Sequence, residues 1–209
     1  YRIQPRYNPN ANDWWMCDHG RYKNDYINAP ERITSVKKRS QDRFEDLTWG
    51  AAISELGEEL KNAVKQTGGK SLAVVVSPFL TVEEAWLLAS YARSLSSETL
   101  LVLGKVPVEG TDEVFKTGFT IRAERCPNRK GVEEVLKHFD QKFLSWDDFL
   151  ARADKGEIKA AYITGGYPDQ WNDDADAARI DKISLRIVQD ILPSQVARKA
   201  QYVVPGTTF

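Results

Sequence analysis

The sequence predicts an α/β fold, a doubly wound parallel sheet preceded by a small irregular N-terminal segment. Three observations predict it: strand-sized apolar runs without polar alternation, helical stretches that begin at capping residues, and a regular alternation of the two. Runs that are apolar on both faces are typical of parallel sheets covered by helices on each side. The composition agrees, since 42% apolar and 28% charged residues are ordinary for a globular chain of 209 residues.

The first half of the regular part alternates helix and strand. A helix begins at Thr48, a candidate N-cap, and ends at Gly68. A buried strand is expected at residues 72–77. Residues 81–84 (Thr-Val-Glu-Glu) then have the form of a capping box, in which the Thr and Glu side chains each accept one free backbone amide. The helix that follows leads to a second buried strand at residues 99–104.

The second half continues the alternation after residues 104–142, which follow no clear pattern. Ser145 begins a short helix that Gly156 ends. Strands are expected at 159–164, 183–189 and 201–204, with a short helix between the last two. We expect the strands near 72–77, 100–104, 159–164 and 185–189 to lie side by side and parallel in a single sheet.

Residues 1–47 differ from the rest of the chain. No period of 2 or 3.6 residues persists there for more than a few positions, so we expect irregular structure packed by Trp14, Trp15, Tyr22 and Tyr26. This divides the chain into residues 1–47 and an α/β domain over residues 48–209. The chain opens without Met and stops without a polar tail, and we expect both ends to be cut from a longer protein.

Charge and composition exclude several classes of partner. A net charge of −1 predicts no nucleic-acid surface, and no apolar run approaches the roughly 20 residues of a membrane span. Cys17 and Cys126 lie too far apart for a CxxC pair and form no disulfide framework, which fits a reducing, cytoplasmic compartment.

Candidate binding residues follow three of the expected strands. In open parallel sheets, ligands sit beyond the carboxyl ends of the strands, where loops and helix N-termini present free amides. Ser77 follows the first strand, Gly165 and Gly166 follow another, and Gln189 and Asp190 follow a third. The glycine pair would let backbone amides approach a phosphate closely. The alternative for each turn is a tight connection with a helix cap and no ligand.

The other candidate groups carry less chemistry. His138 is expected on the exposed face of a helix, and the acidic run 172–176 lacks the Gly and Glu of a calcium loop, which favours a solvated helix start. Cys17 stands between bulky apolar residues and a polar turn, an environment that suits a thiolate ligand of a shielded iron–sulfur cluster. The alternative is a buried free cysteine.

Residues 8–21, with Trp15-Met16-Cys17-Asp18 at their centre, resemble the "N…W-M-C-D-x-G-R" stretch of the large iron–sulfur subunit of NADH–quinone oxidoreductase, in the molybdopterin-oxidoreductase superfamily. Further short matches follow in the family's order, at residues 48–52, 75–77 with 81–85, 127–131, 165–168 and 188–205. The resemblance implies that Cys17 is the last ligand of a 4Fe–4S cluster. The other three ligands would lie upstream of Tyr1, so this chain alone would not hold the cluster.

Departures from the family pattern argue against a bound molybdopterin. His19 stands where catalytic members carry a Lys, Tyr167 replaces the Asn of the family's "G-G-N-P", no molybdenum ligand is recognisable, and the middle region is short. The resemblance therefore implies a structural and electron-transfer domain without its own active site, bound to other subunits of a redox complex at the periphery of a membrane. Two alternatives are the cofactor-binding domain of a true molybdopterin enzyme such as a formate dehydrogenase, and a nucleotide- or anion-binding module.

Overall fold

The computed structural model describes residues 3–10, 12–16 and 18–208 and contains a seven-stranded sheet of order β2-β1-β9-β8-β7-β3-β4. Five of these strands are parallel neighbours: β4 (Leu100–Leu103), β3 (Leu72–Val76), β7 (Ala160–Thr164), β8 (Leu185–Asp190) and β9 (Tyr202–Pro205). The expected α/β class is confirmed, as is the side-by-side parallel arrangement of the expected strands.

The prediction that residues 1–47 lack regular strands is wrong over residues 36–47. There β1 (Val36–Ser40) and β2 (Arg43–Leu47) form an antiparallel hairpin, and Lys37 of β1 pairs with Val203 of β9. The hairpin escapes pattern recognition because its strands are rich in charge and Val36 is the one fully buried residue in them. The assignment of residues 1–47 to the end of an iron–sulfur module stays a prediction.

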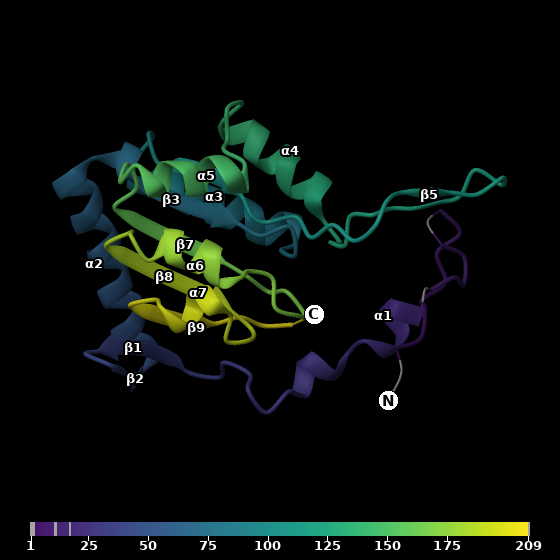
Figure 1. Ribbon diagram of the computed structural model, residues 1–209, viewed down its shortest axis with the longest axis horizontal. Coiled ribbons are helices and arrows are strands. Elements are labelled where there is room, and N and C mark those ends of the chain that lie inside the picture. Colours follow the sequence, from purple (N-terminus) through teal and green to yellow (C-terminus); the bar gives the residue numbers. More distant parts are fainter. Residues whose placement is uncertain (1–2, 11, 17, 209) are drawn as a thin grey trace.

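Helices cover both faces of the parallel strands (Figure 1). One face packs against α2 (Trp49–Thr67), α3 (Val82–Leu95) and α4 (Arg129–Phe139), and the other against α5 (Trp146–Asp154), α6 (Asp174–Ile180) and α7 (Gln195–Arg198). Side chains of β3 therefore pack on both faces of the sheet. Val74 and Val76 pack toward α3 and α4, whereas Ala73 and Val75 pack toward α5–α7. All five β3 side chains are buried, which explains the unbroken apolar run.

Local side chains fix the helix starts that the sequence predicts. Thr81 accepts a hydrogen bond from the Glu84 amide (3.2 Å), and the Glu84 carboxylate accepts one from the Thr81 amide (2.8 Å), so both halves of the capping box are present. Thr48 and Ser145 cap α2 and α5 in the same way through a single bond. Gly68 ends α2 with a left-handed φ of 84°.

The segment between β4 and α4 forms an arm that projects away from the sheet (Figure 1). Its short strands β5 (Glu113–Val114) and β6 (Thr120–Ile121) pair antiparallel, and the ring of Trp15 lies 6.4 Å from that of Phe119. Near the N-terminus, α1 (Asp18–Tyr22) and a 3₁₀ turn at Asp25–Asn28 are the regular elements. Over the described ranges, the structure contains no helix with the length and apolar character of a membrane span.

Candidate functional site

The strand order creates a switch point between β3 and β7. The chain passes from β3 to β4 on one side and later returns to β7 on the other side of β3. The loops that leave β3 and β7 therefore flank a crevice at the carboxyl edge, the place where open parallel sheets bind ligands. Ser77, Gly165, Gly166, Gln189 and Asp190 all lie at this edge, as the sequence predicts.

Ser77 is fully buried and its polar atoms are engaged within the protein. Its amide donates to Oγ1 of Thr164 (2.9 Å), and that hydroxyl donates in turn to the carbonyl of Val75 (2.8 Å). The Ser77 hydroxyl accepts the amide of Phe79 (3.2 Å). Ser77 thus shapes the turn after β3.

The glycine pair lies against Asp190. The Gly165 amide donates to the carbonyl of Gln189 (2.7 Å), and the Gly166 amide donates to Oδ1 of Asp190 (2.9 Å). A Cβ at Gly165 would lie 2.3 Å from the carboxylate carbon of Asp190, and Gly166 has a left-handed φ of 92°. Close approach of Asp190 therefore requires glycine at position 165, and the backbone conformation favours glycine at position 166. Phosphate binding to their amides stays a prediction, and it would have to break both bonds.

Asp190 is 1% exposed and accepts three N–H groups. Oδ1 accepts the amides of Gly166 and Ile191 (2.9 and 2.8 Å), and Oδ2 accepts the indole N–H of Trp171 (2.9 Å). Burial raises the pKa of the Asp190 carboxyl, and these donors oppose that rise. The Gln189 side chain does not join this group of bonds. Its oxygen accepts a hydrogen bond from the hydroxyl of Tyr162 (2.8 Å).

Aromatic side chains fill the crevice. Phe79, from the loop after β3, contacts Tyr167, from the loop after β7, with ring centroids 4.5 Å apart. Tyr167 stacks on Trp171 at 4.7 Å with planes 16° apart, and its hydroxyl donates to the carbonyl of Lys105 (2.6 Å). Tyr167 and Trp171 are 2% and 8% exposed. Sequence reasoning noted Tyr167 as a departure from the family motif but did not identify either residue as part of the site.

The space that remains beside the candidate residues is small. A cavity of about 110 Å³ lies beside Phe79, Thr81, Gly166 and Ile191. Ligand pockets in proteins enclose roughly 300–1,000 Å³. Because this cavity is small and the candidate polar groups beside it are already paired, Ser77, the glycine pair and Asp190 do not fit a pterin cofactor.

A second cleft of about 550 Å³ lies at the same edge, between residues 25–31 and the loops after β7 and β8. Asp25, Glu31 and Asp169 line it together with one cation, Arg198. Three carboxylates against a single guanidinium disfavour a phosphate ligand.

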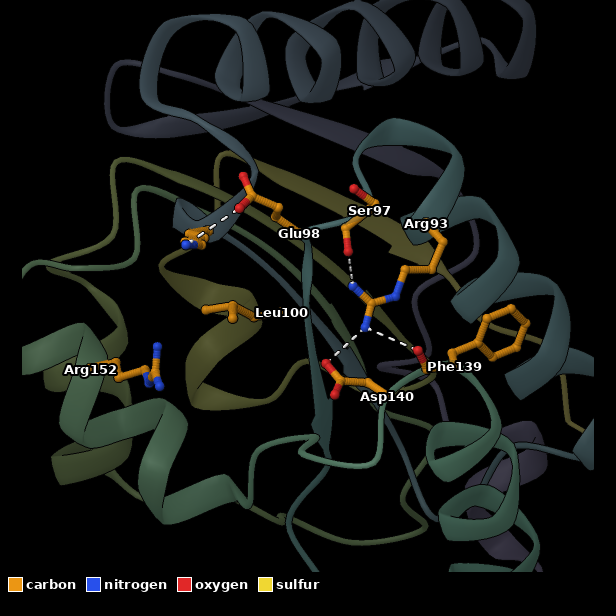
Figure 2. Close-up of a pocket in the computed structure, with 8 residues that line it drawn as sticks. Arg93, Ser97, Glu98, Leu100, Phe139, Asp140 and Arg152 are labelled. Carbon is orange, nitrogen blue, oxygen red and sulfur yellow. Dashed lines mark hydrogen bonds and ion pairs between the residues drawn. The ribbon is translucent and has the colours of Figure 1, made fainter.

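A larger cleft, about 710 Å³, lies at the opposite edge, near the amino ends of β3 and β4 (Figure 2). Arg93 reaches across it to the Asp140 carboxylate (2.8 Å) and also donates to the carbonyl of Thr99 (2.9 Å). Lys70 pairs with Glu98 at 3.3 Å. Arg152 also lines the cleft, and its guanidinium lies 3.8 Å from the Glu157 carboxylate. Because all three cations have acidic partners, the cleft offers a bound anion little uncompensated charge.

The predicted metal ligand Cys17 lies outside the described residues. Within the part that the structure describes, no three His, Cys, Asp or Glu side chains come together as a metal site. Cys126 is half-buried, and burial together with the Glu124 carboxylate 3.5 Å from its sulfur raises the pKa of its thiol to about 11. His138 is exposed on α4, as predicted.

Comparison with known proteins points to oxidoreductases. No family model matches the chain. Over 94 residues it is 27% identical to a putative formate dehydrogenase of Staphylococcus haemolyticus, 28% to a probable oxidoreductase of Bacillus subtilis and 24% to a putative formate dehydrogenase of Staphylococcus aureus. Each match covers 45% of this chain, which spans about a tenth of the length of these relatives.

Proposed function

We propose that this chain is a structural and electron-transfer part of a redox subunit, of the NADH-dehydrogenase or molybdopterin-oxidoreductase type, without an active site of its own. The observation that carries the proposal is the filling of the switch-point crevice by Phe79 and Tyr167, whose rings lie 4.5 Å apart. A domain that served as a cofactor site would need that crevice open and its polar groups unpaired.

Similarity to named oxidoreductases supports a redox-related role, and the ordered short motifs support the iron–sulfur subunit in particular. In this proposal the full-length protein carries a 4Fe–4S cluster with Cys17 as one ligand. Its partners are other subunits of a cytoplasmic redox complex at the periphery of a membrane.

The second candidate function is the cofactor-binding domain of a formate-dehydrogenase-like molybdopterin enzyme. The names of two of the relatives favour it. The paired amides of Gly165 and Gly166 and the small residual cavity count against it. The same paired amides count against a stand-alone module for nucleotides or anions.

The test uses the full-length protein that contains this chain. Cys17→Ser should remove the electron paramagnetic resonance signal of one 4Fe–4S cluster and leave the circular dichroism of the α/β domain unchanged. Cys126→Ser is the matched control and should keep every cluster signal. If Cys17→Ser also keeps every signal, the ligand assignment is wrong.

Metal analysis of the same preparation separates the two candidates. The structural role predicts molybdenum and tungsten well below one atom per chain, together with no pterin fluorescence after oxidation. Stoichiometric molybdenum or tungsten would establish the enzyme instead.

A further inference from the structure

Trp171 has its indole N–H on a buried carboxylate. Nε1 lies 2.9 Å from Oδ2 of Asp190, and the two residues are 8% and 1% exposed. The amides of Gly166 and Ile191 hold the other carboxylate oxygen, so the acceptor is fixed in place. The other buried tryptophan, Trp146, has an indole N–H for which the described residues provide no acceptor.

Two aromatic rings contact Trp171 closely enough to exchange an electron with it. Tyr167 stacks at a centroid distance of 4.7 Å, and Trp146 lies at 5.5 Å, edge to face. Their proton acceptors differ from that of Trp171. The Tyr167 hydroxyl donates to the backbone carbonyl of Lys105, a far weaker base than a carboxylate, and Trp146 has no acceptor in the described part of the chain.

We propose that Trp171 and Asp190 form a site of proton-coupled one-electron oxidation, which accepts the oxidising equivalent of a strong outer-sphere one-electron oxidant. One electron leaves the indole for the oxidant, which is reduced by one electron. The Nε1 proton moves along the existing hydrogen bond to Oδ2. The products are a neutral tryptophanyl radical and the carboxylic acid of Asp190. A one-electron donor such as a thiolate then reduces the radical, and the proton returns to nitrogen.

The chemistry of the pair explains why the radical would settle at this position. An oxidised indole is a far stronger acid than the neutral group, so a base in contact with its N–H traps it as the neutral radical. Burial raises the pKa of Asp190, which increases its affinity for that proton. An electron hole formed on Tyr167 or Trp146 would therefore move to Trp171. The inference goes beyond the proposed function, and it holds whichever redox cofactor the full-length protein carries.

The experiment oxidises the chain with photogenerated ruthenium(III) tris-bipyridine. Several exposed aromatic side chains would compete for the oxidant and are replaced by Phe in the background protein: Trp14, Trp15, Trp49, Trp86, Tyr7, Tyr22 and Tyr91. In this background we expect a neutral tryptophanyl radical, identified by transient absorption and electron paramagnetic resonance. Trp171→Phe should abolish that signal, while Trp146→Phe, the matched control, should retain it.

Two further measurements test the role of Asp190. Asp190→Asn should replace the neutral radical by the protonated radical cation, because the amide is not a base. In the protein with Asp190 intact, formation of the neutral radical should slow in D₂O and should not depend on buffer concentration, since the proton moves within the protein. This second measurement decides the matter if Asp190→Asn does not fold. A radical that survives Trp171→Phe, or one whose formation rises with buffer base, would overturn the proposal.

Discussion

The hydroxyl of Tyr167 donates a hydrogen bond to the backbone carbonyl of Lys105 over 2.6 Å. This bond joins the loop after β7 to the end of β4, across the end of β3 that lies between them. One side chain therefore connects the two strands that flank β3.

Replacement of Tyr167 should separate the contribution of this bond from that of the ring. Tyr167→Phe keeps the ring but leaves the Lys105 carbonyl without its donor, which should lower the free energy of unfolding by about 1–2 kcal/mol. Tyr167→Asn also removes the stacked ring and should cost about 3–5 kcal/mol. Urea unfolding measures both, with Tyr22→Phe at an exposed position as the control. Equal losses for Phe and Asn would show that the ring does not fill the crevice.

Gly165→Ala should destabilise the protein by about 2–3 kcal/mol, because the new methyl group would lie 2.3 Å from the Asp190 carboxylate. Gly57→Ala is the matched control. It lies in α2 with no neighbouring atom within 4 Å of the new carbon, and it should stabilise the helix by about 0.5–1 kcal/mol. Thermal unfolding compares the two variants. Opposite signs support the close approach at Gly165, and a neutral Gly165→Ala contradicts it.

The thiol of Cys126 should be alkylated slowly at neutral pH, and its alkylation rate should keep rising with pH into the alkaline range. Its pKa is raised to about 11, chiefly by burial and also by Glu124, and only the thiolate reacts. In a Cys17→Ser background, the rate with iodoacetamide should rise about tenfold per pH unit up to that value. Glu124→Gln should lower the pKa and speed the reaction at pH 8. We expect Cys17 in the unsubstituted chain to react faster, and a rate plateau for Cys126 near pH 8.5 would contradict its environment.

Glu55 should contribute to stability in a pH-dependent way. In α2 it accepts the ammonium of Lys38 and the hydroxyl of Tyr202 (2.8 Å), and these bonds, that with Lys38 first, lower its pKa. A lowered folded-state pKa stabilises the protein above the unfolded value of 4.5, and this contribution is lost as pH falls through the folded value. Partial exposure keeps it below about 1 kcal/mol.

Urea unfolding of Glu55→Gln and of the unsubstituted protein between pH 3 and pH 7 tests this. The stability difference should be largest at neutral pH and should shrink in acid. Glu58→Gln, at an exposed position of the same helix, is the matched control for the loss of a carboxylate. A Glu55 difference that grows in acid would contradict the sign of the pKa shift.

Much of the fold could be predicted because its determinants are local or strongly patterned. The Thr81–Glu84 capping box lies within four residues, and β3 reads as an unbroken apolar run because both of its faces are buried. The hairpin at residues 36–47 could not be predicted, since its strands are rich in charge and Val36 is the one residue in them that is fully buried.

The candidate site was predicted in position but not in its contacts. Asp190 and the glycine pair each lie at the carboxyl end of a predicted strand, so their position at one edge could be predicted. The hydrogen bond between Asp190 and Trp171 joins two separate segments, and no periodic pattern in the sequence relates them. The acidic run at 172–176 shows the same limit. It begins α6 as expected, yet Asp176 is buried and pairs with Lys105 at 2.7 Å, a partner 71 residues away.

The pairing of β1 with β9 constrains the order in which the chain can fold during translation. Among the strands of this sheet, those of the hairpin are synthesised first, and the partner strand β9, which includes Val203, is synthesised last. Until then β8 and β1 both present unpaired backbone groups, the kind of surface that recruits chaperones or other chains. Insertion of β9 between β8 and β1 pairs the exposed backbone groups of both strands in one step. The sheet is therefore completed only after β9 has left the ribosome.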